Sequence, residues 1–598
     1  MKKAIICLLS LALTFCAFAG CEKTDQSASS PTPTENTEAQ PDITEKTDYV
    51  TETWVMVEIP FEASTLISNV DETELDVVFT NRATGTKLTM PGFWNGGKEW
   101  LVRFAPTEYG IWDFEASTKG KDVGISGKKG TVAANVYKGD LEIYKRGFIK
   151  TEKNVKYFMY DDGTPFFYLG DTHWNMMTEE FDKAGPRAEE IETTSHFKYI
   201  VDRRVAQKFT VYQSEPIGHR YDVTNGITQA DMAGFEHCDQ YFAYIAQKGL
   251  VHANAMLLFP SDVTPKFEND EFLYHLTRYW VARYSAYPVV WTLAQEVDPY
   301  GYSGLKDGEK NIWITACKQI AELDPYRHPT TAHQANAMTV GAFGGAMTES
   351  SYSGEPASKR VSVKSAFYGV EGHSWWGVQW RPEVDRQVNF SIPRDYWLMG
   401  EGKVAVNYES RYEYLYTKEF GNRASAWISY LTGMAGYGYG VQDMWLYDSA
   451  YTADEISSDG IDSVTPEDKT ISWGKTVMFP SGDQMTYLRG FMEAVGWYEL
   501  EPSFDMGIYF VATDSEGFYV SAHNKDEVYV AYLYNRSTVS AGNFASLDKN
   551  ATYTAQWFDV RTGVYTLIDA SVKADANGQY DIPEKPVADD MVILLTKN

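Results

Sequence analysis

The chain has 598 residues, of which 53 are basic and 82 acidic, and its formal net charge is -29. Such an acidic protein is a poor partner for nucleic acid, because phosphate binding needs a cationic face. The chain is also too long for a single hydrophobic core, so we expect several domains in series.

The first 21 residues have the composition of a bacterial lipoprotein signal. Met1-Lys2-Lys3 is a short basic start, Ala4 to Ala19 is an apolar run, and a small residue precedes Cys21. We expect lipid attachment at Cys21, which predicts an exported protein anchored at the bacterial cell surface or on the outer or periplasmic membrane face. A plain signal peptide or a short uncut anchor is the alternative, although the run is short for a transmembrane helix.

Residues 22–48 are rich in Ser, Thr, Pro, Glu and Gln and contain few large apolar residues. Because such a segment cannot bury enough surface to offset its ordering entropy, we predict a flexible tether. From 49 to 138 the pattern changes to short alternating runs such as Thr53–Ile59 and Glu99–Phe104, with glycine-containing turns between them. This pattern predicts a small β-sandwich.

Residues 139–500 alternate buried-strand runs with helical segments. Phe166–Leu169, Phe209–Tyr212, Val251–Phe259 and Val289–Leu293 are strand-like, and amphipathic segments separate them. One (β/α)8 TIM barrel of the α/β class fits this rhythm. A doubly wound open sheet would suit the same alternation, but no Gly-rich phosphate loop follows the first strand.

Residues 501–598 return to short strands. Glu527–Leu533 and Met591–Leu595 are examples, and they predict a second β-sandwich. The barrel is therefore expected to lie between two β-sandwich domains.

Polar and aromatic side chains follow the strand-like runs of the predicted barrel. The active site of such a barrel lies at the carboxyl ends of its strands, so these positions are the candidates. The candidate catalytic pair is Glu296 after the fourth run and Glu409 after the seventh. The candidates for substrate binding are Asp171, His173, Trp174, Gln213, Gln295, His333, His373, Trp375 and Tyr412.

Two carboxylates on different strand ends suit the cleavage of a glycosidic bond. One group protonates the leaving oxygen while the other attacks or stabilises the anomeric carbon. Aromatic rings stack on the C–H faces of sugars, so the tryptophan-rich surroundings favour a carbohydrate substrate. A single glutamate after a strand is more often an ion-paired residue, and it is the shared placement of Glu296 and Glu409 that favours catalysis. Glu215 and Glu413 are reserve carboxylates.

Four segments resemble the apiosidase-like catalytic domain of bacterial polysaccharide-degrading enzymes, glycoside hydrolase family 140 and its relatives. They are Phe167–Trp174, Val290–Glu296, Lys403–Glu413 and Arg423–Trp445. Glutamates at the ends of strands four and seven also resemble the arrangement of clan A retaining glycosidases. Two flanking segments are similar to domains that usually accompany this family, Phe93–Phe104 on the N-terminal side and Gln556–Gly563 in a C-terminal domain sometimes labelled collagen-binding.

The resemblance implies a retaining glycoside hydrolase that works by double displacement. It makes Glu296 the acid/base and Glu409 the nucleophile, and it places Asp171, Trp174 and His333 where the family lines its sugar-binding site. The implied substrate is a glycosidic bond in a complex polysaccharide or oligosaccharide of the plant cell-wall type.

Three positions depart from the pattern that the resemblance implies. Gln295 stands where clan A enzymes commonly have Asn, and Val404 and Tyr408 stand where the family often has Pro and Gly. Gln295 can still hydrogen-bond a sugar 2-hydroxyl. The departures leave the two-carboxylate interpretation intact, but they put a specificity for apiose in doubt.

Other classes of function stay open at this point. A catalytically inactive barrel would make the chain a non-catalytic surface glycan-binding lipoprotein, and the C-terminal domain label would make it an adhesion protein. A metal-dependent hydrolase would need Asp171, His173, His333 and His373 to converge, but the sequence has no HxxxH-type or paired-cysteine spacing. We therefore expect no metal and no cofactor, and the oligomeric state is left open.

Overall fold

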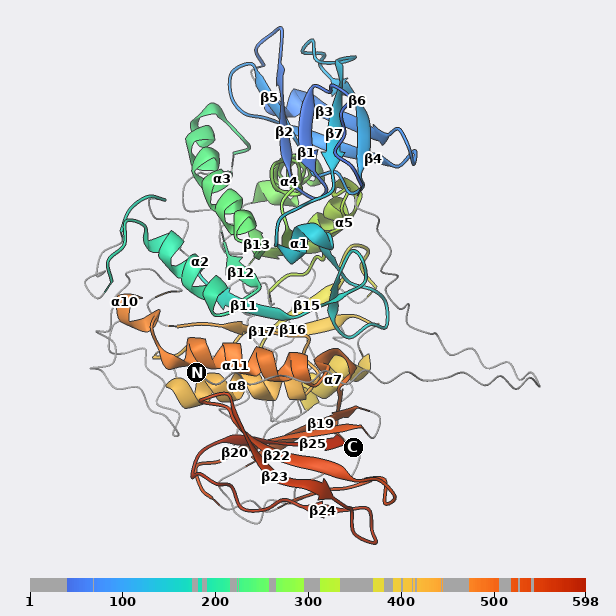
Figure 1. The fold of residues 1–598 in the computed structure, drawn as a ribbon. Helices are drawn as coiled ribbons and strands as arrows, with labels where there is room; N and C mark the ends of the chain where they lie inside the picture. The colour runs from blue at the N-terminus through green and yellow to red at the C-terminus, as the bar shows by residue number, and fades with distance from the viewer. Residues whose placement is uncertain are drawn as a thin grey trace, which may run out of the picture. The chain divides into compact units, whose positions relative to one another are not determined.

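The structure is a computed structural model in which Asp42–Asn598 forms one compact unit (Figure 1). It describes residues 40–67, 69–174, 181–184, 191–215, 223, 225–257, 265–294, 312–333, 369–380, 391–399, 402–410, 412–414, 417–441, 444, 473–504, 518–524, 527–538 and 542–598. The predicted signal and most of the predicted tether lie outside these residues. None of the helices in the described ranges combines the length and the apolar character that crossing a bilayer requires.

The N-terminal part is built from seven strands in the order β1-β7-β6-β3-β4-β5-β2. Their bounds are β1 Tyr49–Glu52, β2 Val57–Glu62, β3 Thr73–Asn81, β4 Lys87–Trp94, β5 Glu99–Phe104, β6 Gly110–Gly120 and β7 Lys129–Asn135, with a 3-10 turn η1 at Val70–Glu72. Every second residue of β3 is buried, as expected for a strand with one face on a core. β4 pairs with β3 along its first part and with β5 at Phe93 and Trp94, so it passes from one group of strands to the other.

A short connecting segment precedes the central sheet. It contains α1 Glu142–Lys145 and the three-stranded sheet of β8 Ile149–Lys150, β9 Phe158–Tyr160 and β10 Pro165–Phe166. The sequence predicted a strand from Phe166, but Pro165–Phe166 pairs with β9, so the first central strand begins only at Tyr168. Phe158 packs on Tyr168 and Trp375 with ring centroids 5.5 and 5.6 Å away.

The central sheet is barrel-like and consists of parallel strands in the order β14-β13-β12-β11-β17-β16-β15. The strands are β11 Tyr168–Thr172, β12 Val211–Ser214, β13 Val251–Leu257, β14 Val289–Ala294, β15 Trp375–Gln379, β16 Val404–Glu409 and β17 Gly436–Tyr439. Single parallel bridges join Thr330 to Trp291 and to His373, and His333 to Gly377. The segment 330–333 therefore occupies the fifth strand position, between β14 and β15. This arrangement confirms the α/β class and the barrel type.

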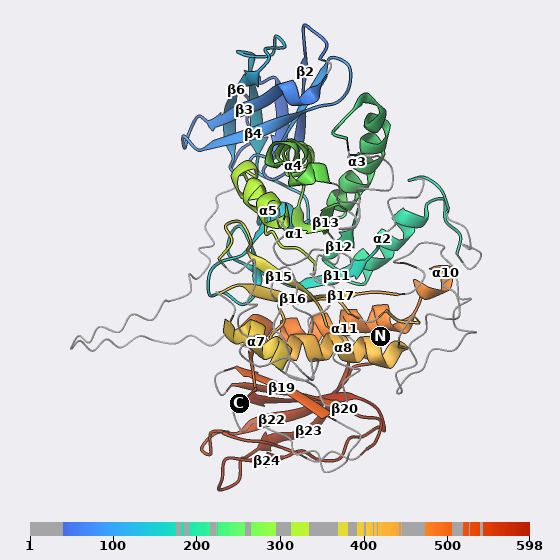
Figure 2. The same cartoon turned by 180° about the vertical axis from the view of Figure 1, so that it is seen from behind.

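Helices separate the central strands in the sequence and pack around them (Figures 1 and 2). They are α2 His196–Ala206, α3 Met232–Gln247, α4 Asp270–Tyr284, α5 Ile312–Leu323, α7 Ser391–Met399, α8 Glu419–Leu431, α10 Trp473–Thr476 and α11 Pro480–Ala494, with 3-10 turns η3 Gln229–Asp231, η5 Pro265–Glu268 and η8 Trp497–Glu499. Local sequence explains several helix starts. Ser195 and Asn269 accept hydrogen bonds from the first turns of α2 and α4, and Pro480 opens α11.

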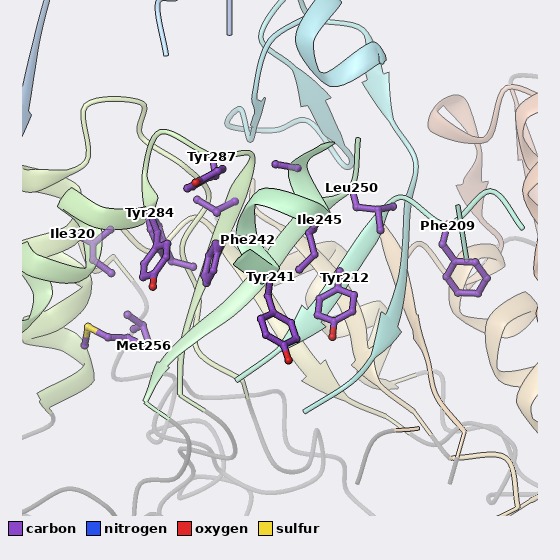
Figure 3. Packing of buried hydrophobic residues seen from close by; sticks show 14 of the residues in the cluster. Phe209, Tyr212, Tyr241, Phe242, Ile245, Leu250, Met256, Tyr284, Tyr287 and Ile320 are labelled. Carbon is purple, nitrogen blue, oxygen red and sulfur yellow. The ribbon is translucent and has the colours of Figure 1, made fainter. Parts of the chain in front are cut away.

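Aromatic side chains fill the layer between the helices and the central strands. Figure 3 shows Tyr212 of β12 beside Tyr241 of α3, and Phe242 of α3 beside Tyr284 of α4. Phe242 stacks on Tyr284 at a centroid distance of 3.9 Å and tilts against His252 at 4.2 Å. Because these rings are almost fully buried, they account for a large share of the apolar surface that folding removes from water.

The C-terminal part contains two antiparallel sheets. One has the order β18-β19-β20-β25-β22-β23, and the other pairs β21 with β24. Their bounds are β18 Glu501–Pro502, β19 Phe518–Asn524, β20 Val528–Tyr534, β21 Asn543–Phe544, β22 Tyr553–Asp559, β23 Val564–Val572, β24 Tyr580–Asp581 and β25 Met591–Lys597. Both flanking parts are thus β-rich as predicted, whereas the sandwich arrangement and the exact domain boundaries stay predictions.

A buried ion-pair cluster joins the N-terminal strands to the helices of the central part. Asp239 of α3 accepts hydrogen bonds from Arg103 of β5 at 2.6 Å and from Arg283 of α4 at 2.7 Å. Arg103 also donates to the backbone oxygen of Arg283 at 2.7 Å. The two guanidinium groups are almost completely buried and share the Asp239 carboxylate, and Arg103 also pairs with the half-exposed Glu58 at 2.9 Å.

We predict that Asp239→Ala destabilises the protein by about 3–5 kcal/mol, because it removes the carboxylate that the buried Arg283 pairs with and leaves Arg103 only the half-exposed Glu58. The matched control is Asp113→Ala, which removes a carboxylate that pairs with Arg82 at the surface and should leave the unfolding midpoint almost unchanged. Urea unfolding followed by tryptophan fluorescence measures both. Equal shifts for the two variants would contradict the importance of the buried cluster.

Candidate active site

Glu409 is the last residue of β16, at the carboxyl end of the central sheet. The hydroxyl of Tyr412 donates a hydrogen bond to its Oε1. The indole Nε1 of Trp174, just beyond β11, donates to the same tyrosine oxygen at 2.8 Å. A hydrogen-bonded chain from Trp174 through Tyr412 therefore holds the carboxylate in one orientation and stabilises its negative charge.

His333 approaches the other oxygen of the carboxylate. Its Nε2 lies 3.2 Å from Glu409 Oε2, and its ring stacks on Trp174 with a centroid distance of 5.8 Å and an interplanar angle of 27°. Burial lowers the pKa of His333 to about 3, so the imidazole is neutral at physiological pH. The contact with Glu409 is therefore that of a neutral ring beside a carboxylate and not an ion pair.

Gln213 lies inside the barrel, beneath Glu409. Its amide nitrogen donates to the backbone oxygen of Tyr408 at 2.8 Å and to Thr172 Oγ1 at 3.1 Å, and its amide oxygen accepts from the hydroxyl of Tyr168 at 3.2 Å. Gln213 is fully buried. It fixes the end of β16 from which Glu409 projects, which makes it a positioning residue in this structure.

Glycines on β17 and just beyond it make room for the large side chains of the site. A Cβ on Gly436 would lie 2.6 Å from Tyr168, one on Gly438 would overlap the backbone of Tyr408, and one on Gly440 would overlap the ring of Tyr412. Any side chain at Gly440 would therefore displace the tyrosine that holds Glu409. The sequence analysis placed these glycines in the segment Arg423–Trp445 that resembles the family but gave them no packing role, although their spacing of two residues was a usable signal.

Asp171 and His173 have a different environment from the one predicted for them. The Asp171 carboxylate accepts hydrogen bonds from Arg204 of α2 and from His173 Nε2, the latter at 2.8 Å, and His173 stacks on Tyr212. The positive charge of Arg204 and the hydrogen bonds from Arg204 and His173 hold the pKa of Asp171 below its usual range, although burial acts in the opposite direction. Successive side chains of a strand point to opposite faces. Asp171 and His173 therefore point away from the barrel interior, which Tyr168 faces, and toward the helix layer.

His373 and Trp375 also lie apart from Glu409. Trp375 is the first residue of β15 and pairs in register with Val404, the first residue of β16, so both mark the amino end of the sheet. The His373 ring contacts Lys403 at 3.2 Å, also at this end. The predicted grouping of these two residues with the strand ends is not what the structure shows, because strand six begins at Trp375 and does not end there.

The predicted partner of Glu409 falls in a part of the chain that the structure does not describe. β14 ends at Ala294, and Gln295 and Glu296 lie outside the described residues, as does Cys21. Leu293 has a φ of 58°, which is rare for a branched residue, and the pairing with β13 shifts register on either side of Ala255. Such irregularities at strand ends are frequent beside functional sites.

The two reserve carboxylates are both buried. Glu413 accepts hydrogen bonds from Ser481 at the start of α11 and, at 3.5 Å, from Tyr439. Burial raises the pKa of Glu413 to about 7. Glu215 follows β12, and its backbone nitrogen donates to the oxygen of Trp174 at 3.4 Å. Within the described ranges, no three His, Cys, Asp or Glu side chains are grouped so that they could hold a metal ion.

Two known families match parts of this chain. The model of the apiosidase-like catalytic domain matches residues 152–499, and a domain of unknown function, DUF5060, matches residues 50–119. No curated protein matches the chain.

Solved structures share the fold at low sequence identity. A protein from Bacteroides vulgatus ATCC 8482 that is proposed to be a glycoside hydrolase has a TM-score of 0.63 at 16% identity, covering 92% of this chain and 100% of its own. A glycoside hydrolase family 5 protein from the same strain has a TM-score of 0.54 at 15% identity, covering 76% of this chain and 94% of its own. A further glycoside hydrolase has a TM-score of 0.55 at 15% identity, with 77% and 98% covered. These likenesses support a fold of the glycoside hydrolase type.

We predict that the imidazole of His333 does not titrate between pH 7.5 and about 4.5, because burial holds its pKa near 3. The unfolded chain gains a proton at this position below about pH 6.5 while the folded protein does not. Folding stability is therefore lost as the pH falls from 6.5 toward 3. NMR of the protein labelled with 15N-histidine measures the titration, and the missing resonance in His333→Gln assigns it. An inflection near pH 6.5 for that resonance would contradict the assigned environment.

Proposed function

Because the chain belongs to the apiosidase-like catalytic domain family, we propose that it is a retaining glycoside hydrolase of complex, plant cell-wall type polysaccharides or oligosaccharides. Glu409 is the nucleophile and Glu296 the acid/base in this proposal. The enzyme is exported and attached to the membrane by a lipid on Cys21. The observation that carries the proposal is the orientation of the Glu409 carboxylate at the end of β16, held by Tyr412 and Trp174.

The proposed reaction is a double displacement. Glu409 attacks the anomeric carbon while Glu296 delivers a proton to the leaving oxygen, which forms a covalent glycosyl-enzyme and frees the rest of the chain. Glu296 then takes a proton from water, and the hydroxide formed in this way displaces the sugar from Glu409 with net retention of configuration. This route needs a separation of about 5–5.5 Å between the two carboxyl groups, whereas inversion needs about 6.5–9.5 Å.

The surroundings of Glu409 suit the role of a nucleophile. A nucleophilic carboxylate has to be ionised and free to form a bond with one oxygen. Tyr412 and Trp174 supply hydrogen-bond donors without adding a positive charge that would bind the carboxylate tightly. The ring of His333, which faces the other oxygen Oε2 at 3.2 Å, is neutral and adds no positive charge either.

Tyr408 is the feature that sets the proposed substrate apart from that of the named relatives. Where the family often has Gly, its ring occupies the barrel interior beside His333, Trp174 and Trp375, with centroid distances of 5.1, 5.7 and 5.8 Å. The volume beneath the reacting sugar is therefore smaller than a glycine would leave. We propose that this ring, together with Gln295, gives the enzyme a sugar preference other than apiose.

We predict that Glu409→Ala lowers kcat by roughly 10³-fold or more, because the covalent step is lost. Azide should restore part of the activity and form a glycosyl azide of inverted configuration. Glu296→Ala with azide should instead form the retained glycosyl azide. Glu142→Ala, at the exposed helix α1, is the matched control and should keep full activity. The measurement is a screen of soluble plant polysaccharides for reducing ends, followed by NMR of the products.

Near-normal turnover by Glu409→Ala would contradict the assignment of the nucleophile. Binding of these polysaccharides without hydrolysis by the unaltered protein would favour the non-catalytic glycan-binding lipoprotein instead. A product of inverted configuration would contradict the retaining mechanism but not the proposed glycosidase activity.

We predict that Tyr412→Phe lowers kcat by about 10- to 100-fold, since a hydrogen bond to a charged group contributes about 1.5–3 kcal/mol. KM should change less than kcat, because the lost interaction acts on the nucleophile and not on the sugar. Trp427→Phe, which alters a buried aromatic residue of α8 away from Glu409, controls for general loosening of the core. Equal losses of kcat in both variants would indicate a structural role only.

A further inference from the structure

A cavity separate from the candidate active site lies where the N-terminal part meets the loops of the central sheet. Its volume is about 590 Å³, which is within the usual range for small-molecule sites of about 300–1,000 Å³. The N-terminal strands and the turn η1 contribute Asp71 and Trp94, and the central part contributes Gln229, Lys266 and Phe272. No residue of this lining takes part in the hydrogen-bonded chain around Glu409.

The walls of this cavity are held in fixed positions by hydrogen bonds between the two parts. The Gly97 backbone nitrogen donates to Gln229 Oε1 at 2.9 Å, and the indole nitrogen of Trp94 donates to the oxygen of Gly97 at 3.0 Å. Tyr279 of α4 donates to the backbone oxygen of Trp94 at 3.0 Å. The cavity is therefore built into the junction and does not require a rearrangement to form.

The chemistry of the lining is mixed polar and apolar. Asp71 offers carboxylate oxygens, and a Cβ on Gly226 across the cavity would lie 4.0 Å from its Oδ2. Lys266 donates to Asn225, so its charge is partly satisfied within the wall. Phe272 is half-buried, and Leu66 at the rim is 64% exposed. A sugar ring has hydroxyl groups at its edge and C–H groups on its faces. It therefore binds where hydrogen-bond donors and acceptors lie beside apolar surface.

The position of the cavity connects it with the face on which Glu409 lies. The wall residues 225–229 belong to the connection that leaves the carboxyl end of β12, and Lys266 belongs to the one that leaves β13. Connections of this kind all lie at the carboxyl end of a parallel barrel, which is also the end that carries Glu409. A glycan that reaches the active site passes over the same face of the molecule.

We propose that this cavity is a second glycan-binding site, which holds a neutral sugar of the polymeric substrate at a distance from the bond that is cleaved. The inference rests on the proposed glycosidase function for its choice of ligand. Its energetic value is that contacts at a remote sugar increase the local concentration of the polymer at the catalytic carboxylates. It also assigns a task to the N-terminal part, whose loops, turn η1 and strand β4 supply half of the lining.

The test measures binding in the inactive Glu409→Ala background by electrophoresis through gels that contain arabinoxylan, xyloglucan or pectin. Asp71→Asn removes the carboxylate but keeps the size of the side chain, and Phe272→Ala removes the apolar wall. Asp140→Asn makes the same chemical change at a fully exposed position outside the cavity. We expect Asp71→Asn and Phe272→Ala to weaken retention by about tenfold on the polysaccharide that retards the parent protein, and Asp140→Asn to leave it unchanged.

The outcomes separate this site from the proposed function. Unchanged retention in Asp71→Asn and in a folded Phe272→Ala overturns the site, even if the unaltered protein hydrolyses the polysaccharide. The absence of retardation of the parent protein by all three polysaccharides overturns it as well. Weakened retention together with a lack of hydrolysis by the unaltered protein supports the site and contradicts the glycosidase.

Discussion

The carboxylate of Glu409 is held by Tyr412, and the ring of Tyr412 fits only because residue 440 is a glycine without a side chain. Tyr412 donates to Glu409 and accepts from Trp174, while its ring occupies the space above Gly440. The chain must therefore bring the ends of β11, β16 and β17 into close contact, and a small shift of any one of them would break these contacts. The parallel pairing of β11 with β17 and of β17 with β16 brings them together. The pairing of the strands in the barrel-like sheet thus determines the orientation of the Glu409 carboxylate.

The same close approach continues below the site. Gln213 links the end of β16 to β11 and β12 through hydrogen bonds to Tyr408, Thr172 and Tyr168. Side chains of this size fit together in the barrel interior because β17 has glycines, Gly436 and Gly438, where it faces them. Buried polar groups that are fully hydrogen-bonded specify one arrangement of a core. The backbone at Glu409 is therefore positioned by the sheet itself, whereas Tyr412 and Trp174, just beyond the strands, orient its carboxylate.

Much of this arrangement could be predicted from the sequence, and the failures have physical causes. The placement of Trp174, His333, Glu409 and Tyr412 near one another followed from the rule that polar residues after barrel strands share one end. That rule does not say to which face of a strand a side chain points. Asp171 faces α2 and forms an ion pair with Arg204 for this reason.

The errors at the sixth strand have a different origin. Trp375 and His373 belong to the start of that strand, and an apolar run alone does not reveal its register against Val404. The glycines of β17 show the opposite case, since their period of two was visible in the sequence, but their meaning depends on which side chains lie opposite. The pattern of a single sequence does not reveal which side chains face each other across neighbouring strands.

The most direct test of the account is to trap the covalent intermediate that retention requires. A 2-deoxy-2-fluoro glycoside of the sugar that the enzyme releases should accumulate as a glycosyl-enzyme, and mass spectrometry of the digested protein locates the added sugar. The account predicts a label on Glu409 and none in the Glu409→Ala variant. A label on Glu413, on Glu215 or on any other residue would contradict it.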